Sequence, residues 1–132
     1  MKDLSKIAFT VLLASTFAFS ARAFAETKTI EMVAVEEKGG KYWRPDHIEV
    51  QAGDTVRIHA VSKIPEKGTS GKKVEYATHS LAIDAYKIDK LINGKGETFE
   101  FVADKVGQFP IVCKLHPAHH GSSLEVKEAK KN

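Results

Sequence analysis

The sequence predicts an all-β fold, a Greek-key sandwich or barrel of about seven or eight strands. Two observations support this class. Short runs of alternating apolar and polar residues recur along the chain, separated by regular turn signals that contain glycine, proline or aspartate. No stretch combines a helix start signal with the apolar spacing of a long helix. At 132 residues the chain has room for one domain, which we place at residues 26–132.

Residues 1–25 are predicted to be a secretory signal peptide and not part of the fold. Lys2 and Lys6 form a short positive start, residues 7–19 are uncharged and mostly apolar, and Ala23 and Ala25 give the small-residue spacing of a cleavage site. The apolar run is too short for a membrane-spanning helix. We therefore expect a periplasmic or secreted chain that begins at Glu26 and has no stable membrane insertion.

Charge and cysteine content narrow the range of partners. Without residues 1–25 the chain keeps 17 basic and 16 acidic side chains, so nothing in its charge favours nucleic acid as a partner. The single cysteine, Cys113, cannot form an internal disulfide. It could pair between chains, remain a buried thiol or bind a ligand, and the histidines near it in the sequence favour a metal.

The first half of the domain is predicted to contain three strands. Residues 29–35 are rich in β-branched residues and end at a polar loop. Residues 47–51 and 55–61 alternate, and a Gly-Asp turn joins them. The side chains expected to face the core in these two strands are Ile48, Val50, Val56, Ile58 and Ala60.

The second half begins with a long polar loop at residues 62–78, which could cover part of the surface. A short apolar strand follows from His79. Residues 86–91 are expected to form one helical turn or to pack loosely. Three further strands complete the fold: residues 97–102, a strand that carries Phe109, Ile111 and Cys113 on one face, and residues 123–127.

Residues 107–121 contain the only cysteine and three of the six histidines. A thiolate with two imidazoles and a weak fourth ligand is the arrangement of copper electron-transfer sites. Cys113 and His116 are close enough in a loop to bind one ion, and His79 is the best candidate for the second imidazole because it begins a strand beside the long loop. His47 and His59 lie on the polar side of their strands, so we expect them at the surface.

These residues resemble those of the cupredoxins. Residues 42–56 look like the entry strands of that family, residues 107–121 resemble its Cys-x-x-His ligand loop, and His79 stands in the place of its early histidine ligand. The resemblance implies one copper ion, cycling between Cu(I) and Cu(II), and redox partner proteins that the sequence does not identify. Within the family, residues 83–86 and 103–117 are most similar to nitrosocyanin-like red copper proteins.

The sequence departs from these relatives at two ligand positions. Nitrosocyanin has a glutamate where this chain has His79, and blue copper proteins have an axial methionine where this chain offers His119 or His120. Matching the family's ligand-x-Gly pattern to Gly121 selects His119, whereas matching Leu124 to the first inward residue of the last strand selects His120. We favour His120, because loop-length changes usually fall before the axial ligand. An imidazole is a harder donor than a thioether, so we expect a lower potential and a redder or greener site.

Three functions are compatible with this composition. The first is one-electron transfer, with His116 as the exit for the electron. The second is chemistry on a small molecule such as nitric oxide, with residues 62–78 as a cover. The third is copper carriage or a structural zinc site, since one cysteine and three histidines also suit tetrahedral zinc. No nucleophile with its base, phosphate loop or paired carboxylates is recognisable, so hydrolysis is not expected.

Overall fold

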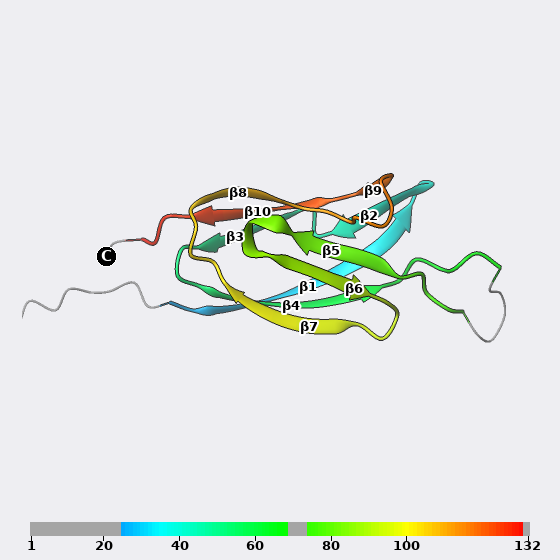
Figure 1. Ribbon diagram of the computed structural model, residues 1–132, viewed down its shortest axis with the longest axis horizontal. Helices are drawn as coiled ribbons and strands as arrows, with labels where there is room; N and C mark the ends of the chain where they lie inside the picture. Colours follow the sequence, from blue (N-terminus) through cyan, green and yellow to red (C-terminus); the bar gives the residue numbers. More distant parts are fainter. Residues whose placement is uncertain (1–24, 69–73, 131–132) are drawn as a thin grey trace, which may run out of the picture.

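The computed structural model describes residues 25–68 and 74–130, so the predicted leader up to residue 24 and residues 69–73 of the predicted long loop lie outside the described residues. Within that part the chain forms a β-sandwich, which confirms the predicted fold class, although with more strands than expected (Figure 1). The elements are β1 (Thr27–Glu37), β2 (Gly40–Arg44), β3 (His47–Gln51), β4 (Thr55–Ser62), β5 (His79–Ile83), a 3-10 turn η1 (Asp84–Tyr86), β6 (Ile88–Ile92), β7 (Glu97–Val102), β8 (Gly107–Ile111), β9 (His119–His120) and β10 (Ser122–Lys127).

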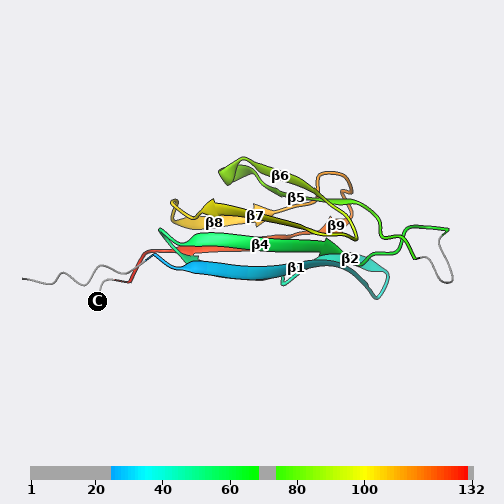
Figure 2. The same ribbon diagram turned by 90° about the horizontal axis from the view of Figure 1, so that it is seen from below.

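The strands form three sheets. A five-stranded sheet has the order β7-β4-β1-β2-β9, a three-stranded sheet has the order β3-β10-β8, and β5 and β6 form a hairpin. Strands β1 and β4 pair in parallel, as do β3 and β10. Figure 2 shows the β5–β6 hairpin on one side of the molecule and β1 with β4 on the other. Parallel neighbours that are not joined by a hairpin require the long crossovers of a Greek key.

Alternation along the strands builds the core. Val56, Ile58 and Ala60 of β4 are fully buried, as predicted, and Ile48 and Val50 of β3 face the same interior. Burying each of the larger side chains contributes roughly 1.5–3 kcal/mol relative to leaving it in water. Trp43, Met32 and Leu124 complete the middle of this core. The described residues include no helix long and apolar enough to cross a membrane.

The prediction for residues 86–91 was wrong. A single 3-10 turn occupies Asp84–Tyr86, and the chain then continues as β6, which pairs with β5 in register from Ile83–Ile88 to His79–Ile92. Ile88 and Ile92 both point into the core. Their spacing of four residues places them on one face of either a strand or a helix, so the sequence pattern does not distinguish the two.

Strands β2 and β9 were not predicted. β2 turns back on β1 through Lys38 and Gly39, both of which have positive φ angles, of 48° and 78°. Two consecutive residues with positive φ are typical of a tight hairpin turn. β9 is only two residues long and pairs in parallel with β2, Lys41 opposite His119 and Tyr42 opposite His120. Strands β2 and β9 together bring the histidines after Cys113 against the edge of the larger sheet.

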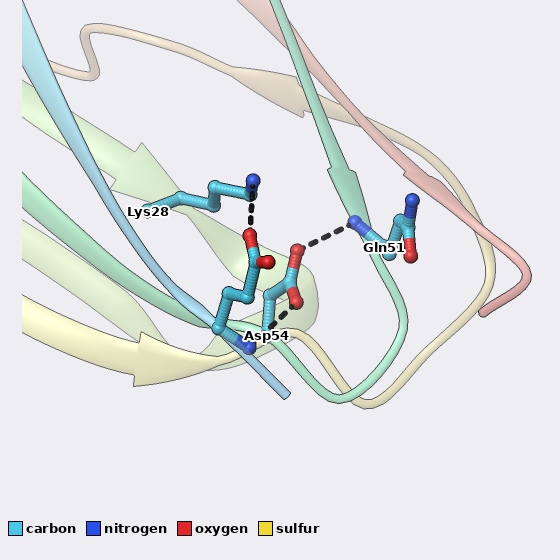
Figure 3. A network of polar contacts seen from close by, with 4 residues as sticks. Lys28, Gln51 and Asp54 are labelled. Carbon is cyan, nitrogen blue, oxygen red and sulfur yellow. Dashed lines mark hydrogen bonds and ion pairs between the residues drawn. The ribbon is translucent and has the colours of Figure 1, made fainter. Parts of the chain in front are cut away.

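The two ends of the sandwich differ. The loop that follows β8 lies at one end, together with the start of β5, and the start of β1 and the β3–β4 turn lie at the other (Figure 1). At the latter end Asp54 accepts hydrogen bonds from the backbone nitrogens of Gln51 at 2.9 Å and Glu26 at 3.2 Å (Figure 3). These bonds close the turn and attach the beginning of β1 to it.

Candidate metal centre

Cys113 is positioned by backbone pairing between β5 and the segment that follows β8. Val112 and Ala82 exchange two backbone hydrogen bonds, of 2.9 and 3.0 Å. This pairing fixes the next residue, Cys113, against the start of β5, where His79 lies. The Cys113 Sγ is 3.9 Å from the His79 Nδ1, although the two residues are 34 positions apart in the sequence.

His116 joins the pair from within the loop. Its Nδ1 lies 3.7 Å from the Cys113 Sγ, and its carbonyl accepts a hydrogen bond from the backbone N–H of His119 at 2.9 Å, which closes a tight turn. The ligand atoms of His79, Cys113 and His116 all lie within 4.8 Å of one another. His79 and Cys113 are buried and His116 is half-buried, so one edge of the group reaches the surface.

Ser80 makes three hydrogen bonds that hold this arrangement together. Its N–H donates to the Cys113 Sγ at 3.3 Å, its Oγ accepts from the Lys114 N–H at 2.6 Å, and its carbonyl accepts from the Trp43 indole at 3.1 Å. A hydrogen bond to the sulfur favours the thiolate over the thiol. Ser80 shows no signal of this role in the sequence, because only its backbone contacts the sulfur.

The two adjacent histidines of β9 face opposite ways. His119 is 6% exposed, its Nδ1 is 3.1 Å from the His79 Nδ1, and its ring stacks on Trp43 with centroids 5.5 Å apart. His120 is exposed and stacks on Tyr42 at 4.5 Å. Successive side chains of a strand point to opposite faces. The structure therefore places His119 beside His79, although outside the set of mutually close ligand atoms of His79, Cys113 and His116, and it places His120 at the surface.

Gly121 allows β9 to approach the ligand loop. A Cβ atom at this position would lie 2.3 Å from the carbonyl oxygen of Ile111, closer than real Cβ atoms come to a backbone atom. Only glycine therefore fits between β9 and β10 at this point. The close passage lies two residues after His119, whose ring is beside His79.

Burial keeps two of the rings neutral. Burial, followed by the like charges that His119, His116 and Lys41 would present, lowers the pKa of His79 to about 4. Burial is also the largest cause lowering the pKa of His119 to about 4, and a hydrogen bond with the Tyr42 backbone opposes it. Neutral imidazole is the form that binds metals. In the described part of the chain, the Nε2 atoms of both rings are buried without a hydrogen-bond partner.

The spacing of the ligand atoms fits a metal ion. With bonds of about 2.3 Å to sulfur and about 2.0–2.1 Å to nitrogen, an ion at a trigonal angle separates the two atoms by about 3.8 Å. The sulfur–nitrogen distances of 3.9 and 3.7 Å agree with this value.

His47 and His59 lie at the surface side of their strands, as expected. The His59 Nδ1 is 2.7 Å from the hydroxyl of Thr98. His47 forms a second group of potential ligands with Glu49 and Glu125, whose atoms also lie within 4.8 Å of one another. Both His47 ring nitrogens have partners, Ser123 at 2.7 Å and Glu125 at 3.1 Å, and Glu49 pairs with Lys127 at 3.1 Å.

Comparison with known proteins identifies the family. The model of the cupredoxin-like domain matches residues 8–123, so the chain belongs to this family, in agreement with the resemblance found in the sequence. No curated protein sequence matches the chain. The finer similarity to nitrosocyanin-like proteins remains a prediction.

Solved structures share the fold at low sequence identity. Copper nitrite reductase from Nitrosomonas europaea is 20% identical with a TM-score of 0.59, over 80% of this chain but only 43% of the reductase chain. The metal-binding domain of a Cu(I)-exporting P-type ATPase from Streptococcus pneumoniae, solved with Cu(I), is 17% identical with a TM-score of 0.55, over 77% of this chain and 93% of that domain. Plastocyanin from Dryopteris crassirhizoma is 20% identical with a TM-score of 0.51, over 74% of this chain and all of plastocyanin.

Proposed function

We propose that this protein is an exported mononuclear copper protein that transfers single electrons. The observation that carries the proposal is the convergence of one thiol and the Nδ1 atoms of His79 and His116 at one end of a rigid sandwich. A soft thiolate combined with two imidazoles selects copper over the hard cations. When bound, copper would supply a one-electron couple between Cu(I) and Cu(II).

We assign the fourth ligand to His119 and not to His120. His119 is buried with its Nδ1 3.1 Å from that of His79, whereas His120 stacks on Tyr42 outside the cluster. The imidazole of His119 is a harder donor than the axial thioether of a blue copper site. Because a harder donor stabilises Cu(II), the proposal includes a lower potential and a red or green colour.

The protein's contribution to electron transfer is to hold the ligands still. The Val112–Ala82 pairing and the three hydrogen bonds of Ser80 fix the positions of Cys113 and His79. Stacking on Trp43 fixes the ring of His119. Ligands that are locked by packing and hydrogen bonds keep their geometry when the charge of the site changes. Little rearrangement is then needed at each electron transfer.

His116 is the proposed exit for the electron. It is the half-buried member of the group, and the residues around it in the loop are exposed, among them Leu115 with half of its surface accessible. A redox partner protein that contacts this loop would come close to the His116 ring. Export to the periplasm by residues 1–25 is supported by the leader-like sequence alone.

The test begins with purified protein loaded with Cu(II). We expect one copper per chain, retained against a modest chelator, with a thiolate charge-transfer band in the visible spectrum and a reversible one-electron wave in voltammetry. The spectrum should differ from that of an axial blue site in both its optical and EPR features. His47→Ala provides the control, since the ring of His47 contacts Ser123 and Glu125 at the surface and its removal leaves the four proposed ligands.

Other results would favour the other functions. A copper–nitrosyl species on exposure to nitric oxide would support small-molecule chemistry. Loss of copper to the chelator would support carriage, and preferential retention of Zn²⁺ without a redox wave would support a structural site. An ordinary axial blue spectrum would contradict the assignment of His119 as a strong fourth ligand.

A further inference from the structure

The end of the sandwich opposite the metal centre contains a buried carboxylate directed at the first residue of the predicted mature chain. Asp54 is 4% exposed, and its Oδ1 accepts a hydrogen bond from the backbone nitrogen of Glu26 at 3.2 Å (Figure 3). The other oxygen accepts from the Gln51 N–H at 2.9 Å. Glu26 is the residue that follows the predicted cleavage site at Ala25.

Glu26 is held in place by more than this bond. Its carbonyl accepts a hydrogen bond from the Thr55 N–H at 2.9 Å, and its side chain binds the Lys28 ammonium at 2.7 Å. Thr27 then pairs with Thr55 at the start of the parallel β1–β4 ladder. The nitrogen of Glu26 is therefore fixed beside Asp54 by the fold itself.

Asp54 lacks a full counter-charge in the uncleaved chain. In residues 25–68 and 74–130 no ion pair is formed by Asp54, and the nearby Lys28 ammonium is bonded to the Glu26 carboxylate instead. A buried carboxylate that is bonded only to neutral donors is less favourable than one paired with a cation. The site thus lacks one positive charge at the position of the Glu26 nitrogen.

Cleavage would supply that charge. Signal peptidase hydrolyses the Ala25–Glu26 peptide bond with one water molecule, which leaves a carboxylate on Ala25 and an α-ammonium group on Glu26. We propose that Asp54 is the binding site for this new N-terminus, and that processing converts the neutral hydrogen bond at 3.2 Å into an ion pair. The inference rests on the proposed export and deepens it, because it makes the processed chain more stable than the chain that still carries the leader.

The exported protein itself provides the test. The full chain is expressed with its own leader, the exported product is purified, and its intact mass identifies the first residue. A matched variant carries one alanine inserted between Ala25 and Glu26, and the product that keeps this alanine is selected by mass. The extra residue turns the Glu26 nitrogen back into an amide. Both forms are also made with Asp54→Asn, and all four are unfolded in denaturant.

We expect the unfolding equilibrium constant of the extended form to be about tenfold larger than that of the form beginning at Glu26. In the Asp54→Asn background, the added alanine should change the unfolding equilibrium constant less than twofold. Equal stability of the two forms with Asp54 present, or an unchanged difference with Asp54→Asn, would overturn the proposal. A first residue other than Glu26 in the exported product would overturn it as well, and the copper spectrum of the same samples tests the proposed function independently.

The pH dependence provides a readout that a purely structural role of Asp54 would not give. The charged groups in contact at the new amine are Asp54, the Glu26 carboxylate and Lys28. Asp104, which follows Ala103, and Lys127 at the end of β10 are the charged residues on the other segments that are hydrogen-bonded to the turn before β4, and β7 places the apolar Val102 opposite Thr55. An α-amino group titrates at about 7.7–8.0 in the unfolded chain, and pairing raises its pKa in the folded one. The advantage of the Glu26 form should be full below about pH 7.5 and narrow towards pH 10. A constant difference across this range would contradict the ion pair, even if the Asp54→Asn variant fails to fold.

Discussion

Residues 25–68 and 74–130 contain two groups of potential metal ligands, and the two differ in burial and in hydrogen bonding. The group of His79, Cys113 and His116 is largely buried, and the His79 Nε2 has no hydrogen-bond partner in the described part of the chain. The second group, His47, Glu49 and Glu125, lies on exposed strand faces. Each of its side chains already has a partner, among them Ser123 and Lys127.

The comparison shows that the spacing of the ligand atoms does not distinguish the two groups, whereas their burial and hydrogen bonding do. Both groups bring their atoms within 4.8 Å of one another. In the surface group, a metal would have to displace water and take the place of the existing partners of His47 and Glu49. In the buried group, burial has already withdrawn His79 from water and lowered its pKa to about 4, so its imidazole is neutral.

Removal of the thiol from the buried group should have the largest effect on copper binding, and substitution of His47 in the surface group should have none. Cys113→Ala eliminates the only soft ligand, so we expect loss of the visible charge-transfer band and copper retention weaker by at least about 100-fold. Chelator competition and optical titration measure both. His47→Ala should leave band and retention unchanged, and a copper band that persists in Cys113→Ala would show that the cysteine is not a ligand.

Acid should destabilise the metal-free protein through the buried group. Folding lowers the pKa of His79 and His119 to about 4, from about 6.5 in the unfolded chain. The unfolded chain therefore binds more protons between these values, so the free energy of unfolding should fall as the pH drops below about 6.5 and be unaffected by these groups above it. We expect a loss of about 2–4 kcal/mol between pH 7 and pH 5, measured by denaturant titration.

Copper loading gives the control for this acid effect. A bound metal occupies the ring nitrogens of the folded chain, which then take up no protons, while the same nitrogens of the unfolded chain still take them up. The loaded protein should therefore lose at least as much stability as the metal-free protein over the same pH range. A smaller loss in the loaded form would mean that copper does not occupy these nitrogens.

Substitution of the adjacent histidines should separate the buried from the exposed position within a single strand. His119→Met keeps a side chain of similar size but replaces a hard donor with a soft one. The preference of the site for Cu(II) over Cu(I) should therefore fall at least about tenfold. This corresponds to a rise in potential of about 60 mV or more. The optical spectrum should shift towards that of a blue site.

The matched control is His120→Met, whose side chain lies outside the cluster against Tyr42. We expect its potential, measured by voltammetry under the same conditions, to stay within about 10 mV of the unsubstituted protein, which is well below the tenfold effect. The reverse result, a large shift for His120→Met and a small one for His119→Met, would restore the sequence-based choice of His120.

The smallest effect is expected at the surface group. Glu125→Gln removes the charge beside His47, where the pair lies 3.1 Å apart at the surface. We expect the stability to change by no more than about 0.5 kcal/mol and the copper stoichiometry to stay at one per chain. Calorimetry and metal analysis measure these two quantities. A second bound copper in the unsubstituted protein that disappears in Glu125→Gln would show that the surface group is also a metal site.

The sequence predicted those parts of the fold and site that depend on local pattern. Alternation identified β3 and β4, with the inward residues correct at Ile48, Val50 and Ile58. Spacing in one loop was enough to pair Cys113 with His116, and the strand onset at His79 indicated the third member of the group.

Long-range pairing limited the rest of the prediction. β2 contains Lys41 and Arg44, and most of its residues are only half-buried, so it shows no clean alternation. The orientation of His119 and His120 depends on how β9 pairs with β2, and a two-residue strand has no pattern of its own. Without β2, the sequence left two histidines as candidates for one position.

The stacking of Trp43 on His119 also gives the molecule its own optical reporter. Trp43 is the only tryptophan in the sequence, and its ring lies 5.5 Å from that of His119. All indole fluorescence therefore originates beside the proposed copper ligands. Copper loading, reduction and release should each change this single emission, so all three could be followed by fluorescence in the purified, unlabelled protein.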